Sequence, residues 1–427
     1  MDATDKRFDI VIFGATGFTG QLVTRYFLTE PETAPGRLRW AIAGRDERKL
    51  QLLLQSLKTK LPHVDADRID AVPIVVADGR DDDAVRRMVQ ATRVVLSVAG
   101  PYAVYSARVV QHCAQLGVHY CDLTGELLWI KDNHRQYEAL AKQTGARIVH
   151  CCGFESVPSD VLSFLLADAC QRQQQHQQQQ LARIDFVWTE TLGGASGGTC
   201  HSLLQMMDKA TADDVRRMSS PFFLTDDRYA DAKHDDGDVV ARNASPLALT
   251  YDHNVQSRTA FFIGALANQM VVLRSNFLFR EAYGKRFAYV ERLGLRHALQ
   301  WIMALALTVV GWLALYRWTR ALLWWVVPSP GTGPPEALMA RGYFTAEAFA
   351  TDESGRVVAK GTATCVGDPG YLQTSKMISE VAFCLANDER DGGLEGGGFL
   401  TPATVGGRSL AARLNDKKVI SFNVQST

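Results

Sequence analysis

Three glycines spaced three residues apart follow a short apolar run near the start of the sequence. The run Ile10–Phe13 is typical of a buried strand, and Gln21–Leu28 has helical character. A glycine-rich turn between a strand and a helix lets the backbone approach a pyrophosphate closely, and the helix N-terminus supplies free N–H groups. The pattern predicts a dinucleotide site; an ordinary strand-to-helix turn is the plainer alternative. The residues of this turn are Gly14, Ala15, Thr16, Gly17, Phe18, Thr19 and Gly20.

The residues after the second predicted strand, Trp40–Ala43, bear on the choice between NAD and NADP. An acidic residue there would accept a hydrogen bond from the ribose 2′-hydroxyl of NAD. This sequence has Arg45 instead, whose guanidinium can bind a 2′-phosphate through two hydrogen bonds, assisted by Lys49 or Arg48. The pattern favours NADP, although these residues also suit the solvated start of a helix. Asp78, after the third strand, is expected either to border the adenine or to cap the next helix.

A turn of small residues follows the fourth predicted strand, Val94–Val98. Ligands of open parallel sheets bind at the carboxyl ends of the strands. We therefore expect Ala99, Gly100 and Pro101 to lie beside the nicotinamide ribose, with Pro101 fixing the turn. Tyr102 is expected either to face the nicotinamide ring or to serve packing.

Polar residues on the loops after strands four to six are candidates for proton transfer. Hydride transfer is the chemistry of the cofactor itself, whereas the protein positions it and can supply a proton. The candidates are Tyr102, Asp122, Glu126 and Glu155. For Glu126, a charge at a helix N-terminus is an equal alternative. No Tyr-x-x-x-Lys pair follows the fourth strand, which argues against a short-chain dehydrogenase mechanism.

The elements that position these residues alternate between short apolar strands and helical stretches over residues 1–155. Such alternation predicts a doubly wound parallel sheet, an α/β Rossmann domain. Residues 156–391 are expected to form a second α/β or α+β domain, with a hairpin made by Gly342–Ala350 and Val357–Val366. Residues 392–427 form a C-terminal segment that can pack back on the Rossmann domain.

An apolar insertion at about residues 298–328 interrupts the second predicted domain. Trp301–Tyr316 carries no charge. As a helix it would be roughly 24 Å long, which is short for a bilayer core of about 30 Å. Its tryptophans and tyrosines suit a membrane interface. Because the chain must return to complete the second domain, we expect a monotopic hairpin or interfacial helix; a buried core helix is the alternative.

The composition narrows the class of protein. Lys+Arg and Asp+Glu both number 46, so the formal net charge is zero and gives no electrostatic reason to expect nucleic-acid binding. The eight cysteines are scattered, with no CxxC pair and no zinc spacing, which fits cytosolic usage, and we expect no metal site. The N-terminus lacks a signal-peptide pattern, so secretion is not expected.

Several of these stretches resemble the saccharopine dehydrogenase-like oxidoreductases. The resemblance is carried by residues 13–20, 43–45, 100–102, 119–126, 152–160 and 398–403. It implies a Rossmann domain, a following α/β domain and a pyridine nucleotide. The family includes trans-acting enoyl reductases of bacterial glycolipid synthesis and a eukaryotic member associated with lipid droplets and membranes. Glu155 departs from the family pattern, in which Asp is expected in many relatives.

These observations predict an NADP-dependent oxidoreductase at the cytosolic face of a membrane or lipid droplet. Its substrate would be lipid-like, with an enoyl or carbonyl group, and a homodimer is left open. One alternative is a membrane or droplet scaffold that keeps the nucleotide fold without catalysis. The other is a soluble amino-acid-type dehydrogenase, although the sequence shows no convergent arginines for a substrate with several carboxylates.

Overall fold

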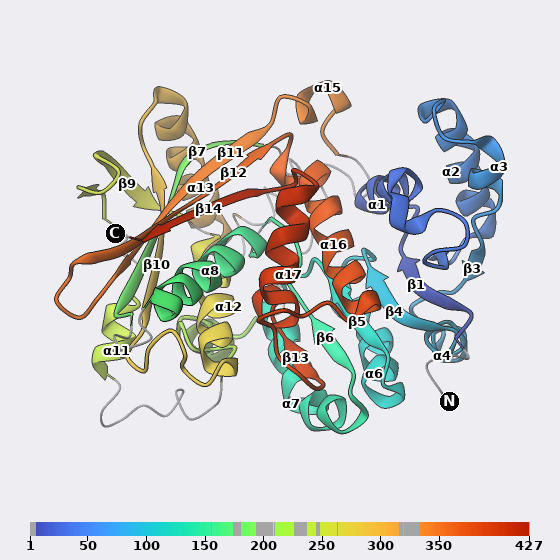
Figure 1. Ribbon diagram of the computed structural model, residues 1–427, viewed down its shortest axis with the longest axis horizontal. Helices are drawn as coiled ribbons and strands as arrows, with labels where there is room; N and C mark the ends of the chain where they lie inside the picture. The colour runs from blue at the N-terminus through green and yellow to red at the C-terminus, as the bar shows by residue number, and fades with distance from the viewer. Residues whose placement is uncertain are drawn as a thin grey trace.

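Two seven-stranded sheets form the framework of the part of the chain that the structure describes (Figure 1). We call the sheet nearer the N-terminus sheet A and the other sheet B. The computed structural model describes residues 6–154, 156–173, 181–193, 208, 210–225, 237–244, 248–262, 264–315, 319 and 333–426. The candidate Glu155 lies outside the described residues.

Sheet A is the doubly wound parallel sheet that the sequence predicts. Its order is β13-β6-β5-β4-β1-β2-β3, and its strand pairs are parallel. The strands are β1 Phe8–Phe13, β2 Trp40–Gly44, β3 Ile74–Val76, β4 Thr92–Ser97, β5 His119–Asp122, β6 Arg147–Val149 and β13 Gly398–Leu400. The strand order reverses at β1, which pairs with β2 on one side and β4 on the other. This switch point is where ligands of such sheets bind.

Helices cover both faces of sheet A because successive strand residues point to opposite faces. Ile10 and Ile12 belong to the hydrophobic cluster that includes α1, α2, α16 and α17, whereas Val11 and Phe13 pack with α4, α6 and α7. The helices are α1 Phe18–Thr29, α2 Glu47–Lys60, α3 Ala66–Asp70, α4 Asp82–Gln90, α5 Tyr102–Tyr105, α6 Ala107–Leu116, α7 Leu127–Thr144, α16 Thr374–Asn387 and α17 Pro402–Asp416. One face is therefore completed by helices from the far end of the chain.

Sheet B is mixed and has the order β14-β12-β11-β7-β10-β9-β8. Its strands are β7 Arg183–Leu192, β8 Thr250–Asp252, β9 Ser257–Phe261, β10 Ala288–Gly294, β11 Tyr343–Thr351, β12 Val357–Val366 and β14 Ser421–Ser426. β7 and β10 are parallel, and the other pairs are antiparallel. The predicted hairpin is confirmed as β11 and β12, whose register runs from Tyr343 opposite Val366 to Thr351 opposite Val357.

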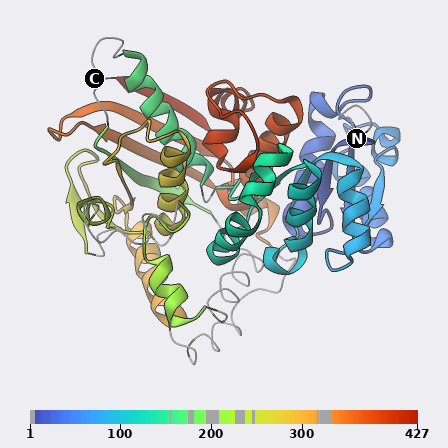
Figure 2. The ribbon, with the colours of Figure 1, turned by 90° about the horizontal axis from the view of Figure 1, so that it is seen from below.

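The two sheets share one hydrophobic core. The remaining helices are α8 Val157–Gln173, α10 Ala212–Met218, α11 Gly237–Arg242, α12 Ala265–Leu278, α13 Ala298–Leu315 and α15 Glu336–Met339. α8 contacts β11, β12 and β14, and α17 contacts α8, β6 and β14. Ile10 of sheet A and Trp188 of sheet B accordingly belong to the same buried cluster. Figures 1 and 2 show α16 and α17 between the two sheets.

The end of the chain contributes one strand to each sheet. β13 pairs with β6 in sheet A, and after α17 the chain enters β14, which pairs with β12 in sheet B. The apolar insertion is represented among the described residues mainly by α13, which reaches away from both sheets in Figure 2. Within the described part of the chain, no helix combines the length and the apolar character needed to cross a membrane.

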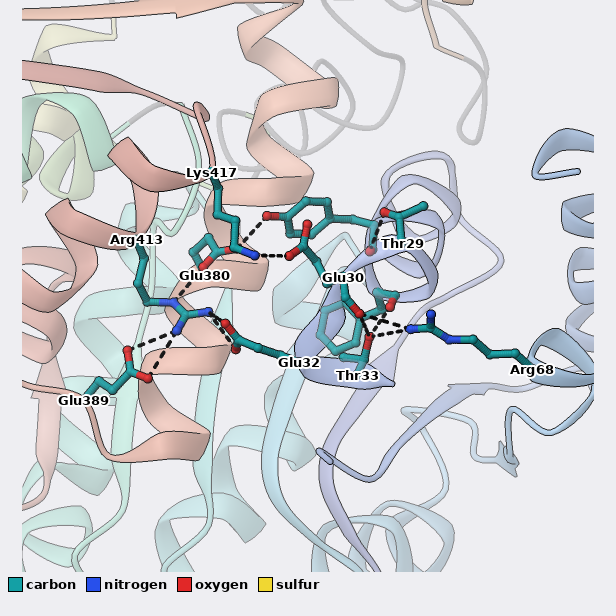
Figure 3. A network of polar contacts seen from close by, with 11 residues as sticks. Thr29, Glu30, Glu32, Thr33, Arg68, Glu380, Glu389, Arg413 and Lys417 are labelled. Atoms are coloured by element: carbon teal, nitrogen blue, oxygen red, sulfur yellow. Dashed lines mark hydrogen bonds and ion pairs between the residues drawn. The ribbon is translucent and has the colours of Figure 1, made fainter. Parts of the chain in front are cut away.

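Arg413 of α17 joins the C-terminal helices to the part of the molecule built on sheet A (Figure 3). Its Nε donates to Glu380 at 2.7 Å, its Nη2 to both oxygens of Glu32 at 2.7 and 2.8 Å, and its Nη1 to Glu389 at 3.2 and 3.1 Å. The hydroxyl of Tyr26 donates to the other oxygen of Glu380 at 2.6 Å. Burial alone would lower the pKa of Arg413, but Glu380 and Glu32 raise it above its ordinary value.

Replacing this arginine should destabilise the whole fold. Arg413→Ala is expected to lower the free energy of unfolding by about 3–5 kcal/mol, because Glu380 would remain buried without its cation. Urea denaturation followed by circular dichroism measures the loss. Lys58→Ala, which removes the exposed ion pair with Asp70, is the control and should cost less than about 1 kcal/mol. Equal losses in the two variants would contradict this account.

Candidate functional site

The glycine-rich turn joins β1 to α1 at the carboxyl edge of sheet A. The N–H of Gly14 donates to the carbonyl of Ala43 on β2 at 2.9 Å, and the N–H of Gly17 donates to the carbonyl of Gly14 at 3.0 Å. Gly17 is the N-cap of α1 and has no side chain to accept a hydrogen bond from the first turn of the helix. The first turn of α1 therefore has no side-chain cap for its backbone N–H groups, which together with the positive end of the helix dipole suit an anion.

Two of the glycines are required by close packing. A Cβ on Gly14 would lie 2.8 Å from the backbone nitrogen of Ala99, and Gly14 also has a φ of 91°. A Cβ on Gly20 would lie 2.3 Å from the carbonyl oxygen of Gly14. The turn is thus pressed against both the start of α1 and the turn after β4. This arrangement fits a pyrophosphate bound by backbone groups.

The other residues of the turn hold it in place. Ala15 is fully buried beneath the turn. The carbonyl of Thr16 accepts a hydrogen bond from the side chain of Gln21 at 3.2 Å. Phe18 meets Tyr371 edge to face, with ring centroids 5.4 Å apart, and Thr19 is half-buried on the first turn of α1.

A surface hollow of about 720 Å³ lies at the carboxyl ends of β2 and β3. Arg45 directly follows β2, is exposed and lines this hollow. Arg48 also lines it and Lys49 does not; the backbone N–H of Lys49 donates at 3.0 Å to Asp46, which caps α2. The full lining is Arg45, Asp46, Glu47, Arg48, Gln51, Val76 and Asp78. Two arginines therefore line a hollow at the sheet edge where the sequence predicts a 2′-phosphate site.

Asp78 lines the same hollow and does not cap the following helix. The capping alternative is wrong because Asp81 is the N-cap of α4 and accepts from the N–H of Ala84 at 3.1 Å. Asp78 instead accepts from the backbone N–H of Arg80 at 3.0 Å and from its guanidinium at 3.4 Å. These bonds and the nearby charge of Arg45 lower the pKa of Asp78.

The turn after β4 passes through Ala99, Gly100 and Pro101 into α5. The peptide bond between Gly100 and Pro101 is cis. Tyr102 begins α5, is buried, and stacks on Trp129 of α7 with ring centroids 6.3 Å apart. Because Ala99 packs against Gly14, this turn and the glycine turn form one continuous surface along the edge of the sheet.

Glu126 binds the backbone at the end of the turn that follows β4. Its two carboxylate oxygens accept the backbone N–H groups of Tyr102 at 2.8 Å and Ala103 at 3.1 Å. The sequence offered a charge at a helix N-terminus as one of two roles for Glu126, and the structure shows that role with one difference. The helix whose N–H groups it binds is α5, not α7, which Glu126 immediately precedes.

Asp122 is fully buried at the end of β5 and is bound by two side chains. One oxygen accepts from the hydroxyl of Tyr120 at 2.8 Å and lies 2.9 Å from Nδ1 of His150. The other accepts the N–H of Thr124 at 3.1 Å. Burial and the charge of Asp122 raise the pKa of Tyr120. The sequence reasoning missed His150, although its place at the end of the sixth predicted strand was a usable signal.

Two polar residues that follow β6, Ser159 and Asp160, bind sheet B and the C-terminal segment. The hydroxyl of Ser159 donates to Glu291 of β10 at 3.0 Å. Asp160 accepts from Ser275 of α12 at 2.5 Å and from the backbone N–H of Ala403 in α17 at 2.8 Å. Burial raises the pKa of Asp160 to about 7. These residues position the two sheets relative to each other.

Comparison with known proteins adds to this geometry. Residues 10–149 match the family model described as saccharopine dehydrogenase NADP binding domain. A protein of Mycobacterium tuberculosis (strain ATCC 25618 / H37Rv), whose name assigns it to the trans-acting enoyl reductases, is 35% identical, covering 97% of both chains. The trans-acting enoyl reductase of Mycobacterium bovis (strain BCG / Pasteur 1173P2) is 33% identical over 98% of both chains. The chain belongs to the saccharopine dehydrogenase-like oxidoreductase family.

Membership of this family confirms two of the predictions. The protein is an NAD(P)-dependent oxidoreductase, and its cofactor is NADP.

Among solved structures, apo saccharopine dehydrogenase (L-Glu forming) from Saccharomyces cerevisiae aligns over 98% of this chain and 100% of that chain, with a TM-score of 0.48 and 12% identity.

The close packing at Gly14 makes a direct prediction about cofactor binding. Gly14→Ala should weaken the affinity for NADPH by at least about tenfold, because the added methyl would displace the turn after β4. Fluorescence titration measures the affinity. Gly36→Ala is the matched control, since Gly36 also has a positive φ but nothing within 4 Å of its Cβ position. Wild-type affinity in Gly14→Ala would refute the proposed fit of the turn.

Proposed function

We propose that this protein is an NADPH-dependent reductase of a lipid-like substrate with an enoyl or carbonyl group, acting at the cytosolic face of a membrane or lipid droplet. The observation that carries the reductase part is the hollow beside the glycine turn, in which Arg45 and Arg48 stand where a 2′-phosphate would bind. The mycobacterial relatives are named as trans-acting enoyl reductases, which supports the choice of an enoyl substrate.

The chemistry requires one hydride and one proton. Bound NADPH supplies the hydride, which adds to one end of a C=C or C=O bond, and the other end takes a proton. Among the described candidates, the carboxylates of Asp122 and Glu126 are occupied by side-chain and backbone donors inside the protein. Tyr102 is our candidate for the proton donor because it begins α5, directly after the turn at the carboxyl end of β4, where ligands of such sheets bind. Glu126 fixes the backbone of that turn, and Asp122 orients its neighbours.

The lipid part of the proposal rests on α13. Among the side chains of this helix that the structure describes, four large apolar ones face solvent: Trp301 is 41% exposed, Ile302 64%, Leu305 66% and Val309 48%. Their spacing places them on one side of the helix, and α13 contains no charged residue. An uncharged helix with an exposed apolar side and a tryptophan near its start suits the interface of a lipid surface.

Cofactor preference tests the reductase proposal. NADPH should bind at least about tenfold more tightly than NADH, and Arg45→Ala should remove most of that preference, because charge-assisted hydrogen bonds to the 2′-phosphate are lost. Fluorescence titration with both nucleotides measures this. Arg37→Ala, at an exposed arginine in the loop before β2, is the control and should behave as wild type.

Turnover separates the enzyme from the scaffold. Consumption of NADPH that depends on an added fatty enoyl thioester would support the reductase. Tight NADPH binding without turnover of any enoyl or carbonyl lipid would favour the non-catalytic scaffold. Turnover of amino-acid substrates alone would favour the amino-acid-type dehydrogenase.

Lipid attachment is tested separately by sedimentation with phosphatidylcholine vesicles. Leu305→Glu should lower the vesicle-bound fraction at least about fivefold, because a charge is costly in the apolar region of a lipid layer. Leu52→Glu changes a leucine of α2 that is 52% exposed and should leave binding unchanged. If wild type does not sediment with vesicles, or if both variants lose binding equally, α13 is not a lipid-binding helix.

A further inference from the structure

The hollow at the ends of β2 and β3 has an unexpected balance of charge for a phosphate site. Its lining contains two arginines, Arg45 and Arg48, and three carboxylates, Asp46, Glu47 and Asp78. A 2′-phosphate brings about two further negative charges close to them. Unless some of the carboxylates are compensated, they oppose the ligand that the arginines attract.

Two of the three carboxylates are compensated by neighbours. Asp46 accepts the N–H of Lys49 at the positive end of α2. Asp78 is held by Arg80, whose backbone N–H donates to Oδ1 at 3.0 Å and whose Nε and Nη2 lie 3.4 Å from Oδ1 and Oδ2. Arg80 is not among the residues that line the hollow. Its link to the hollow is the carboxylate of Asp78, which it binds and which lines the hollow.

The position of Arg80 is fixed by the turn on which it stands. A Cβ on Gly79 would lie only 2.1 Å from the carbonyl oxygen of Tyr105, so the segment from Asp78 to Arg80 packs directly on the end of α5. The guanidinium of Arg80 lies over the ring of Tyr105, with Cζ 5.7 Å from the ring centroid. A cation over an aromatic face is held there electrostatically.

We propose that Arg80 is a positioning residue for cofactor selection, which binds Asp78 and thereby lets the hollow accept the 2′-phosphate of NADPH. Released from Arg80, Asp78 would be an uncompensated carboxylate in the lining of the hollow, where its charge would oppose the phosphate. The two arginines therefore have different roles. Arg45 attracts the phosphate, and Arg80 neutralises the charge of Asp78, which would otherwise repel it. The inference rests on NADP being the cofactor.

The test compares the ratio of NADPH to NADH affinity in a set of variants by fluorescence titration. Arg80→Gln should weaken NADPH binding about tenfold and change NADH binding less than about twofold, because NADH lacks the phosphate. Arg80→Lys should retain most of the preference for NADPH. Asp78→Asn alone should retain the preference for NADPH, since the carboxylate that Arg80 compensates is then absent.

The double variant decides how Arg80 acts. In an Asp78→Asn background, Arg80→Gln should cost less than about twofold, because no carboxylate remains to be compensated. A full tenfold loss in that background would mean that Arg80 contacts the phosphate directly and would overturn the inference. So would equal losses for NADPH and NADH in Arg80→Gln, which indicate general damage to the site.

Two controls keep the outcomes distinct. Arg37→Gln removes the same charge at the opposite edge of sheet A and should leave both affinities unchanged. Failure of the wild type to prefer NADPH would refute the cofactor assignment itself. A wild-type preference for NADPH that Arg80→Gln leaves intact would refute only the role of Arg80.

Discussion

The packing of α16 and α17 on one face of sheet A is the constraint on which the rest of this structure depends. The first half of the chain builds a nucleotide-binding sheet but leaves part of one face without helices. α16 contacts α1, β4 and β5, and α17 contacts β6, so both supply that cover from the end of the chain. Arg413 of α17 binds three carboxylates, and one of them, Glu32, follows α1. Because the same helices also pack near sheet B, the two sheets cannot move independently without breaking a common core.

The cofactor edge is built on backbone contacts more than on side chains. Gly14 and Gly20 remove side chains where the turn meets Ala99 and α1. Glu126 binds the backbone of the neighbouring turn at Tyr102, and Asp122 ties β5 to β6 through His150. Such a surface is preorganised, since little has to reorder when a nucleotide arrives. Side-chain chemistry is concentrated at the two ends, in the arginine-lined hollow and around Tyr102.

The sequence predicted six of the seven strands of sheet A, because most of them contain a short apolar run before small or polar residues, but it did not predict β13. Sheet B was harder for a physical reason. β10 carries Glu291 within the strand, which breaks the apolar pattern, yet this carboxylate is buried and accepts hydrogen bonds from Trp188, Asn268, Ser159 and Tyr289. α12 buries residues on all sides, Arg274 among them, so it shows no helical periodicity. Such polar residues are stable in the interior only when groups from other parts of the chain form hydrogen bonds with them. The site shows the same division. Arg45 was predicted from its place after a strand, whereas folding alone brings Asp122 to His150 and the ring of Tyr105 to the guanidinium of Arg80.

The place of β13 has a consequence for the synthesis of the chain. A nascent chain that has emerged through β6 already contains the residues of the glycine turn, but its sheet lacks both the neighbour of β6 and the cover of α16 and α17. Apolar side chains such as Ile12 and Leu96 then have no complete core to enter. Contacts between segments so distant in the chain form slowly, and exposed apolar faces invite aggregation meanwhile. Sheet A therefore reaches its final form only after α17 has been synthesised, and until then a nascent chain leaves this face of the sheet uncovered.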